Sequence, residues 1–209
     1  MKKVFLLLVI TGFLFSCVNK QSNTEQLTEE YILKTILDSC LEKQPNAMNN
    51  DITRSILADS IKATIQCYIG DSLPFLSNIP LKYEMALEYL PSPFDFESES
   101  FKNAGKYVVK FSFSESSNKC ELSKEYQTTF QIFTIMDKEA VATLIDGALY
   151  YVNGKFIDFA NNSKETGFVL PSGKCLVDYP SISRSALDNK PFINLGTLII
   201  ENATFIPIE

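Results

Sequence analysis

Four carboxylate residues lie in or beside predicted strands, where a pair of them could catalyse hydrolysis: Asp146, Asp158, Asp178 and Glu201. Two carboxylates that flank a scissile bond can serve as general acid and general base. No spacing in the sequence brings any two of these acids to a working separation, so we favour solubility charges on strand edges. Catalysis by paired carboxylates therefore stays an alternative hypothesis.

A second acidic group alternates along the chain at Asp95, Glu97 and Glu99. Alternation places three carboxylates on one side of an extended segment, and a hard cation such as Ca²⁺ binds oxygen ligands of this kind. The ligand spacing and the turn glycine of an EF-hand are missing from this stretch. We therefore expect a solvated acidic loop beside Pro91 and Pro93, and no metal site.

The chain contains no histidine, which removes several mechanisms at once. Ser-His-Asp triads, Cys-His pairs and His-ligated metals are excluded. Ser116 and Lys119 have the S-x-x-K spacing of a histidine-free serine hydrolase. That chemistry requires the pair on a helix with companion motifs, whereas these residues lie in a predicted polar loop. Phosphate-binding glycine motifs are also absent, so we expect no catalytic residue and no cofactor.

The N-terminus has the pattern of an export signal. Lys2 and Lys3 precede an apolar run from Val4 to Phe15, which is typical of a secretory signal peptide. The run is too short for a bilayer-spanning helix, which needs roughly 20 residues. Leu14-Phe15-Ser16-Cys17 resembles the lipobox of bacterial lipoprotein precursors, over residues 1–20 only. The alternatives are an ordinary secretory signal cut elsewhere or a short anchor.

The lipobox resemblance implies that residues 1–16 are removed and that Cys17 carries the lipid. Val18, rather than Asp, follows this cysteine, which in that class implies the outer membrane. No early acidic run follows, so we expect the domain to face the periplasm, joined to the bilayer by a polar tether over residues 17–26. Acyl chains contribute ~0.8 kcal/mol for each buried CH₂ group, enough for several chains to hold a soluble domain on a membrane.

The net charge of the mature chain limits the classes of molecule that it is expected to bind. Removing residues 1–16 takes away two lysines and no acid, which leaves 17 basic and 25 acidic side chains and a net charge of −8. Nonspecific nucleic-acid binding needs clustered Lys and Arg to displace counterions, so no nucleic-acid partner is expected. Docking on anionic lipid is disfavoured for the same reason.

Four cysteines remain after lipidation, in a compartment where disulfides persist: Cys40, Cys67, Cys120 and Cys175. They allow two disulfides with three connectivities, and none forms a C-x-x-C pair. Cys120 and Cys175 both lie in polar, loop-like segments, so we predict that these two are bonded. Cys40 and Cys67 follow apolar stripes and are predicted to be buried thiols.

Tyr150 and Tyr151 are adjacent in a predicted strand, so their side chains should face opposite sides. One is expected in the core. The other could stand exposed beside Tyr68 or Tyr89 as a ligand-binding platform. A tyrosine at the edge of the core, with its ring packed and its hydroxyl in water, is the competing interpretation.

Hydrophobic periodicity predicts one leading helix followed by strands. Apolar residues at three-and-four spacing predict a helix over 27–43, and a helical turn is predicted over 50–57 with Asn50 or Asp51 as its cap. Alternation then predicts strands over 61–69, 81–89 and 107–113. A strand that is apolar on both faces is predicted over 127–136, and 141–145 fits either a strand or a helix.

The second half of the chain is predicted to contain a hairpin and several short strands. Asn153-Gly154 is the strongest two-residue turn signal, between strands 149–152 and 155–157. Further strands are predicted at 168–170 and 175–179. Residues 180–191 read as a polar excursion, and 197–206 as one bent strand or two.

Together these patterns predict a single mostly β domain of α+β type over 27–209, with the helix leading an antiparallel barrel or sandwich. Hydrophobic residues make up 45% and charged residues 21% of the chain, as in ordinary globular proteins. The helical turn before residue 60, the paired strands and the late segment Gly-Thr-Leu-Ile-Ile-Glu-Asn resemble OB-fold lipoprotein domains of unknown function over 46–206.

We expect a non-catalytic domain that binds an envelope protein or a glycan, because the sequence offers little chemistry. This hypothesis predicts an exposed apolar or tyrosine-lined patch without converging acids. The first alternative is a histidine-free, carboxylate-dependent hydrolase of envelope or dietary polymers, which predicts a cleft with two acids, one of them desolvated. The second alternative is a purely structural envelope protein.

Overall fold

The computed structural model describes residues 31–89, 105–118, 120–160, 179–185 and 189–208. The chain forms two longer helices first, then strands joined by short helices. In chain order the elements are α1 (Ile32–Glu42), α2 (Asp51–Gln66), the 3₁₀ helix η1 (Pro74–Ser77), β1 (Leu81–Glu88), β2 (Tyr107–Ser114), α3 (Glu115–Asn118), β3 (Gln127–Met136), α4 (Lys138–Val141), β4 (Leu149–Phe159), β5 (Ser181–Arg184) and β6 (Pro191–Pro207).

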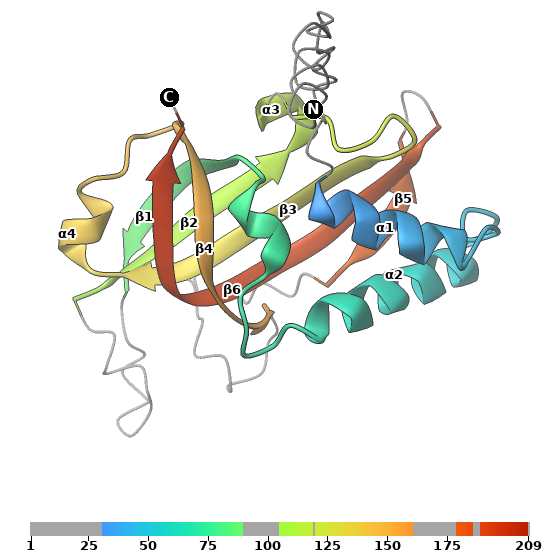
Figure 1. Ribbon diagram of the computed structural model, residues 1–209, viewed down its shortest axis with the longest axis horizontal. Coiled ribbons are helices and arrows are strands. Elements are labelled where there is room, and N and C mark those ends of the chain that lie inside the picture. The colour runs from blue at the N-terminus through green and yellow to red at the C-terminus, as the bar shows by residue number, and fades with distance from the viewer. Residues whose placement is uncertain (1–30, 90–104, 119, 161–178, 186–188, 209) are drawn as a thin grey trace, which may run out of the picture. The chain divides into compact units, whose positions relative to one another are not determined.

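The strands form one sheet in the order β3-β2-β1-β4-β6-β5, and β3 pairs with β6 as well. Five strands therefore form a ring of neighbours, with β5 alongside β6 outside that ring (Figure 1). The pairs are antiparallel except β3 with β6, which is parallel. The prediction of a mostly β fold is confirmed, and this pairing is compatible with a barrel or a sandwich.

Strand β6 joins three neighbours, and it is longer than predicted. It pairs with β5 through residues 191–194, with β3 through 192–200 and with β4 through 198–207. Pro191 opens the strand, a position where the missing N–H costs no ladder bond. Strand β5 lies in the stretch predicted as a polar excursion. The pattern missed it because three of its four residues are exposed, so no apolar alternation marks it.

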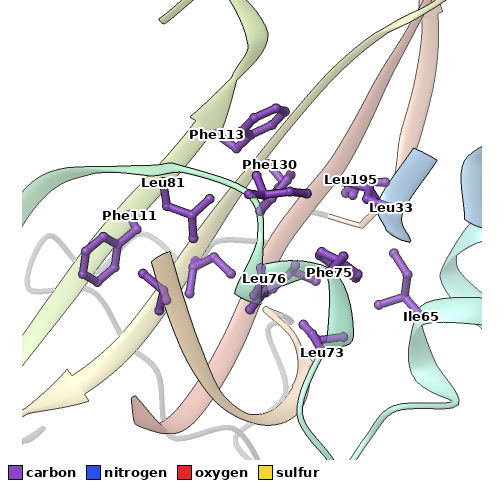
Figure 2. Packing of buried hydrophobic residues seen from close by; sticks show 14 of the residues in the cluster. Leu33, Ile65, Leu73, Phe75, Leu76, Leu81, Phe111, Phe113, Phe130 and Leu195 are labelled. Carbon is purple, nitrogen blue, oxygen red and sulfur yellow. The ribbon is translucent and has the colours of Figure 1, made fainter. Parts of the chain in front are cut away.

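The helices and the sheet share one core. Figure 2 shows Leu33 of α1, Ile65 of α2 and Phe75 of η1 among side chains from the strands. The rings of Phe113 and Phe130 stack with centroids 5.1 Å apart, and Phe75 meets Phe130 edge-on at 6.1 Å. Burying a side chain of this size stabilises the fold by about 1.5–3 kcal/mol, so the helices are fixed to the ring by apolar packing.

The predicted strand over 61–69 is wrong, because α2 runs to Gln66 and a turn follows it. Asn50 and Thr53 start the helix with a reciprocal cap: Thr53 N donates to Asn50 Oδ1 at 2.9 Å and Asn50 N donates to Thr53 Oγ1 at 3.2 Å. The buried residues then follow helical spacing, at Leu57, Ala58, Ile61 and Ile65. Isoleucines four residues apart fit both periods, which made the alternation misleading.

The predicted hairpin at Asn153-Gly154 is also wrong, because both residues lie inside the single strand β4. Asn153 faces Thr204 and Lys155 faces Glu201, so the register shifts here and the extra residue lies on β6. A Cβ on Gly154 would come within 2.8 Å of the Glu201 carbonyl oxygen. Glycine is present because two backbones approach closely at a bulge, and no turn is needed.

The remaining predictions for helices and thiols have mixed outcomes. Helix α1 occupies 32–42 of the predicted 27–43, whose first four residues lie outside the described part. Cys40 is buried as predicted, at 3% exposure. Cys67 is exposed, contrary to prediction, because it follows α2 two residues beyond the buried Ile65 and so turns away from the core. Residues 141–145 continue the short helix α4 into a turn.

Candidate functional site

A hollow of about 350 Å³ lies where α1 ends and α2 begins. No carboxylate lines it. The lining residues combine aliphatic carbon with amide and hydroxyl groups and one lysine: Lys43, Gln44, Pro45, Asn46, Ala47, Thr53 and Ile56. A volume in this range is large enough for a side chain of a partner or a small molecule.

Hydrogen bonds fix the connection that forms the floor of this hollow. Thr53 Oγ1 donates to the Ala47 carbonyl at 2.9 Å, which ties the first turn of α2 to the loop. Arg184 of β5 donates from Nη2 to the Met48 carbonyl at 2.7 Å. The loop is therefore held by both the helix that follows it and a distant strand, and the hollow is preformed.

Two isoleucines stand exposed beside the hollow. Ile52 is 74% exposed and Ile56 is 52% exposed. They are four residues apart on α2, so they lie on the same face of the helix, one turn from each other. Exposed apolar residues rimmed by polar groups are typical of surfaces that bind other molecules.

A hydrogen-bonded polar cluster lies between α1 and the start of β3. The Tyr126 hydroxyl donates to Asp38 Oδ1 at 3.0 Å, and Lys34 Nζ donates to Asp38 Oδ2 at 2.5 Å. Tyr126 is 1% exposed. Burial, followed by the neighbouring Asp38 carboxylate, raises the pKa of the Tyr126 hydroxyl, so it stays protonated and donates.

Glu115, the first residue of α3, closes the other side of this cluster. Its Oε1 accepts the Thr128 N–H at 3.1 Å. Burial raises the pKa of the Glu115 carboxyl to about 7, and the neighbouring Glu121 acts in the same direction. The amides of Thr128 and Leu122, and Lys190, oppose that change. Near neutral pH this carboxyl therefore exists in both protonation states.

Cys120 lies in the same cluster and is 5% exposed. Burial is the main cause that raises the pKa of its thiol, Glu115 adds to it, and a hydrogen bond with Tyr31 opposes it. A thiol with a raised pKa is a poor nucleophile. Its predicted disulfide partner Cys175 lies outside the described residues, as does Cys17, so both the disulfide and the lipidation remain predictions.

The candidate acids of the alternative, hydrolase hypothesis have separate surroundings. Asp158 accepts from Gln66 Nε2 at 3.3 Å and from the Phe159 N–H at 2.7 Å. Glu201 faces Lys155 across β4 and β6 and is exposed. Asp146 is exposed in the turn before β4. Asp178 lies outside the described residues.

The other candidate residues contribute no site to the described part of the chain. Ser116 is exposed and its Oγ lies 3.1 Å from Ser114 Oγ; its proposed partner Lys119, like the acidic residues Asp95, Glu97 and Glu99, lies outside the described residues. Among the described residues, no group of three or more His, Cys, Asp or Glu is arranged to hold a metal ion.

The two adjacent tyrosines face opposite sides of the sheet. Tyr150 is 2% exposed, packs edge-on against Phe111 and Phe205, and accepts the Ile145 N–H at 2.9 Å. Tyr151 is 36% exposed and faces Ile206 across β4 and β6. Tyr89 is buried in a separate small cluster with Val108 and Phe133, so it offers no exposed ring to a platform.

Sequence reasoning missed both the hollow and the polar cluster. Tyr126 and Asp38 are 88 positions apart, and neither belongs to a recognisable motif. The one available signal for the hollow was Pro45-Asn46 between two helices, together with Ile52 and Ile56 on the polar side of α2.

No protein-family model, curated protein or solved structure matches this chain. In the described ranges, no helix is both long and apolar enough to span a bilayer.

Proposed function

We propose that the chain is a lipid-anchored, non-catalytic domain of the cell envelope that binds a partner protein at the hollow between α1 and α2. The observation that carries this proposal is the pair Ile52 and Ile56, exposed at 74% and 52% beside a hollow lined by no acid. An aliphatic side chain of a partner could enter the hollow and cover both isoleucines, which would remove apolar surface from water.

A protein partner fits this surface better than a glycan does. Sugar rings bind best on flat aromatic faces, and the hollow has none among its lining residues. The isoleucines offer branched aliphatic carbon, which packs against other apolar side chains. A glycan therefore remains as the alternative ligand that the experiment below can identify.

A carboxylate-dependent hydrolase has less support. That alternative needs two acids in one cleft, one of them desolvated. Asp158 is bonded to Gln66, and Glu201 faces Lys155. Glu115 has a raised pKa, but its Oε1 is occupied by a backbone amide of its own chain.

The anchor and the fold type belong to the same proposal. We infer that acylated Cys17 holds the domain on the outer membrane, facing the periplasm. We also propose that the domain is an OB-like barrel. Three features support this: the ring order β1-β2-β3-β6-β4, the single parallel pair between β3 and β6, and the position of α4 between β3 and β4.

Site-specific photo-crosslinking in the native host tests the docking surface. The full-length chain carries a photoreactive side chain in place of Ile56, and the membrane fraction is illuminated and resolved by mass. The matched control carries the same group in place of Ile145, which is 67% exposed in the turn before β4. We expect a discrete protein adduct from position 56 and none from position 145.

Two outcomes would contradict the proposal. Equal adducts from both positions would mean nonspecific collision, and the absence of any adduct at position 56 would favour a purely structural protein. An adduct that a glycosidase removes would replace the protein partner with a glycan. When Ile52→Asp is combined with the photoreactive side chain at position 56, the yield of the specific adduct should fall at least about tenfold, since a loss of 1.4 kcal/mol in binding free energy has that effect.

A further inference from the structure

The segment 120–126 connects α3 to β3 and contacts two other parts of the fold. Three of its residues, Cys120, Leu122 and Tyr126, are at most 5% exposed and belong to the main core. On one side the segment meets α1, because the Tyr126 hydroxyl donates to Asp38 and the Cys120 thiol is hydrogen-bonded to Tyr31. The segment is therefore hydrogen-bonded both to Tyr31, the residue just before α1, and to Asp38 in the middle of α1.

On its other side the segment is held by one carboxyl group. Glu115 Oε1 accepts the Thr128 N–H at 3.1 Å, and Glu115 also accepts a hydrogen bond from the Leu122 amide. The backbone adds a weaker link, from Cys120 N to the Glu115 carbonyl at 3.3 Å. The Glu115 carboxyl thus accepts one hydrogen bond from within the segment, at Leu122, and one from β3 just beyond it, at Thr128.

The surroundings of Glu115 do not favour a full negative charge. The like charge of Glu121, which belongs to the segment itself, raises the pKa of the Glu115 carboxyl. Among the described residues, Lys190, ahead of β6, is the cation that lowers the pKa of this carboxyl, and its Nζ already donates to the Lys124 carbonyl at 2.6 Å. The Thr128 Oγ1, on the residue that Glu115 binds, is buried without a hydrogen-bond partner.

We propose that Glu115 and segment 120–126 form a proton-sensitive latch, closed when Glu115 is neutral and weakened when it ionises, which fastens α1 to the start of β3. When Glu115 is neutral, its carboxyl still accepts hydrogen bonds from the two amides, and the closed state does not have to bury a charge. The ionised form gains more from water, so it favours a state in which the segment opens. When the segment opens, Tyr126 leaves the core and its hydrogen bond to Asp38 breaks.

The expected size follows from proton linkage. The carboxyl has a pKa of about 7 when closed and 4.5 when exposed, so the closed state can weaken by at most about 300-fold between acidic and alkaline pH. Most of that change falls between pH 5 and pH 8. Helix α2 makes no hydrogen bond to this cluster among the described residues, so it should respond only through global unfolding of the domain, whose free energy depends on the same carboxyl.

Hydrogen exchange of the full chain at pH 5 and pH 8, corrected for the intrinsic rate, tests the latch. In the wild type, protection of amides over 120–128 should fall on the order of 100-fold between the two conditions, with a smaller fall over 32–42. Glu115→Gln keeps an acceptor oxygen and carries no charge, so its protection should be the same at both values. Glu125→Gln, an exposed neighbour on the same segment, is the matched control and should keep the wild-type response.

A second variant separates the latch from its effect on α1. In Tyr126→Phe the hydrogen bond to Asp38 is lost, so α1 should exchange faster at both pH values while segment 120–128 keeps its pH response. A wild-type pH response in Glu115→Gln would overturn the proposal. The readout requires no partner, so its outcome is independent of docking at the hollow.

Discussion

At the scale of single residues, Asn118 is the most connected buried polar group in the described part. It is 2% exposed. Its Nδ2 donates to the Pro80 carbonyl at 2.7 Å and to the Ser112 carbonyl at 3.2 Å, and its Oδ1 accepts the Ser114 N–H at 3.3 Å. One amide side chain thereby joins the entry to β1 with the end of β2.

Replacing Asn118 with Ala should lower the free energy of unfolding by about 2 kcal/mol, because three buried backbone groups lose their partner. Urea denaturation monitored by circular dichroism measures the change. The exposed neighbour Ser116→Ala should shift the midpoint little. If the two variants unfold at the same urea concentration, the hydrogen bonds of Asn118 contribute nothing to stability.

A second prediction concerns Glu115 and the pH dependence of the free energy of unfolding. Its pKa is about 7 in the folded chain and 4.5 in the unfolded chain, so between these values the folded state binds more protons. Stability should therefore fall as pH rises from 4.5 through 7 and then level off. The fall should be smaller than the upper bound of about 3.4 kcal/mol, because solvent screens a carboxyl that is only half-buried. Urea midpoints at pH 5 and pH 8 should differ less for Glu115→Gln than for the wild type. Parallel shifts in both proteins would contradict this assignment.

At the scale of elements, the close crossing of β4 and β6 at Gly154 decides the geometry of the ring. A Cβ there would lie 2.8 Å from the Glu201 carbonyl and 3.0 Å from the Ile200 Cδ1. Gly154→Ala must push the strands apart, at a cost of about 1–3 kcal/mol for an overpacked site. Lys155→Ala, exposed on the same strand, is the control. A Gly154→Ala variant as stable as the control would show that the strands separate freely here.

The sequence predicts an element correctly where its apolar residues fit only a helical or only a strand periodicity. It fails where they fit both periodicities. Strands β1 and β2 agree with the predicted ranges because their apolar residues alternate without a helical alternative. Strand β3 also agrees, although it was predicted from an apolar run on both faces. The first half of α2 agrees with the helical turn predicted over 50–57 and its cap at Asn50. The second half was predicted as a strand because Ile61 and Ile65 satisfy both periods. Strand β5 is polar and exposed, so nothing in its own residues marks it.

At the scale of the whole molecule, the candidate sites could not be predicted because they join residues distant in sequence. Tyr126 meets Asp38 across 88 positions, and Arg184 reaches Met48 across 136. Local patterns indicate which residues are apolar, but the partner of a buried hydroxyl or carboxyl depends on how the ring closes. The predicted N-terminal signal is the opposite case, because its resemblance to a lipobox depends on neighbouring residues alone and needs no fold.

The central claim is that a lipid on Cys17 holds this folded binding domain outside the cytoplasm. Intact-mass analysis of the detergent-extracted protein tests it most directly, with Cys17→Ala as the variant and Cys67→Ala, which removes an exposed thiol, as the control. We expect the wild type and the control to lack residues 1–16, to carry acyl mass on Cys17 and to fractionate with membranes, while Cys17→Ala loses both properties. A native N-terminus without acyl mass, together with membrane-bound Cys17→Ala, would contradict the claim.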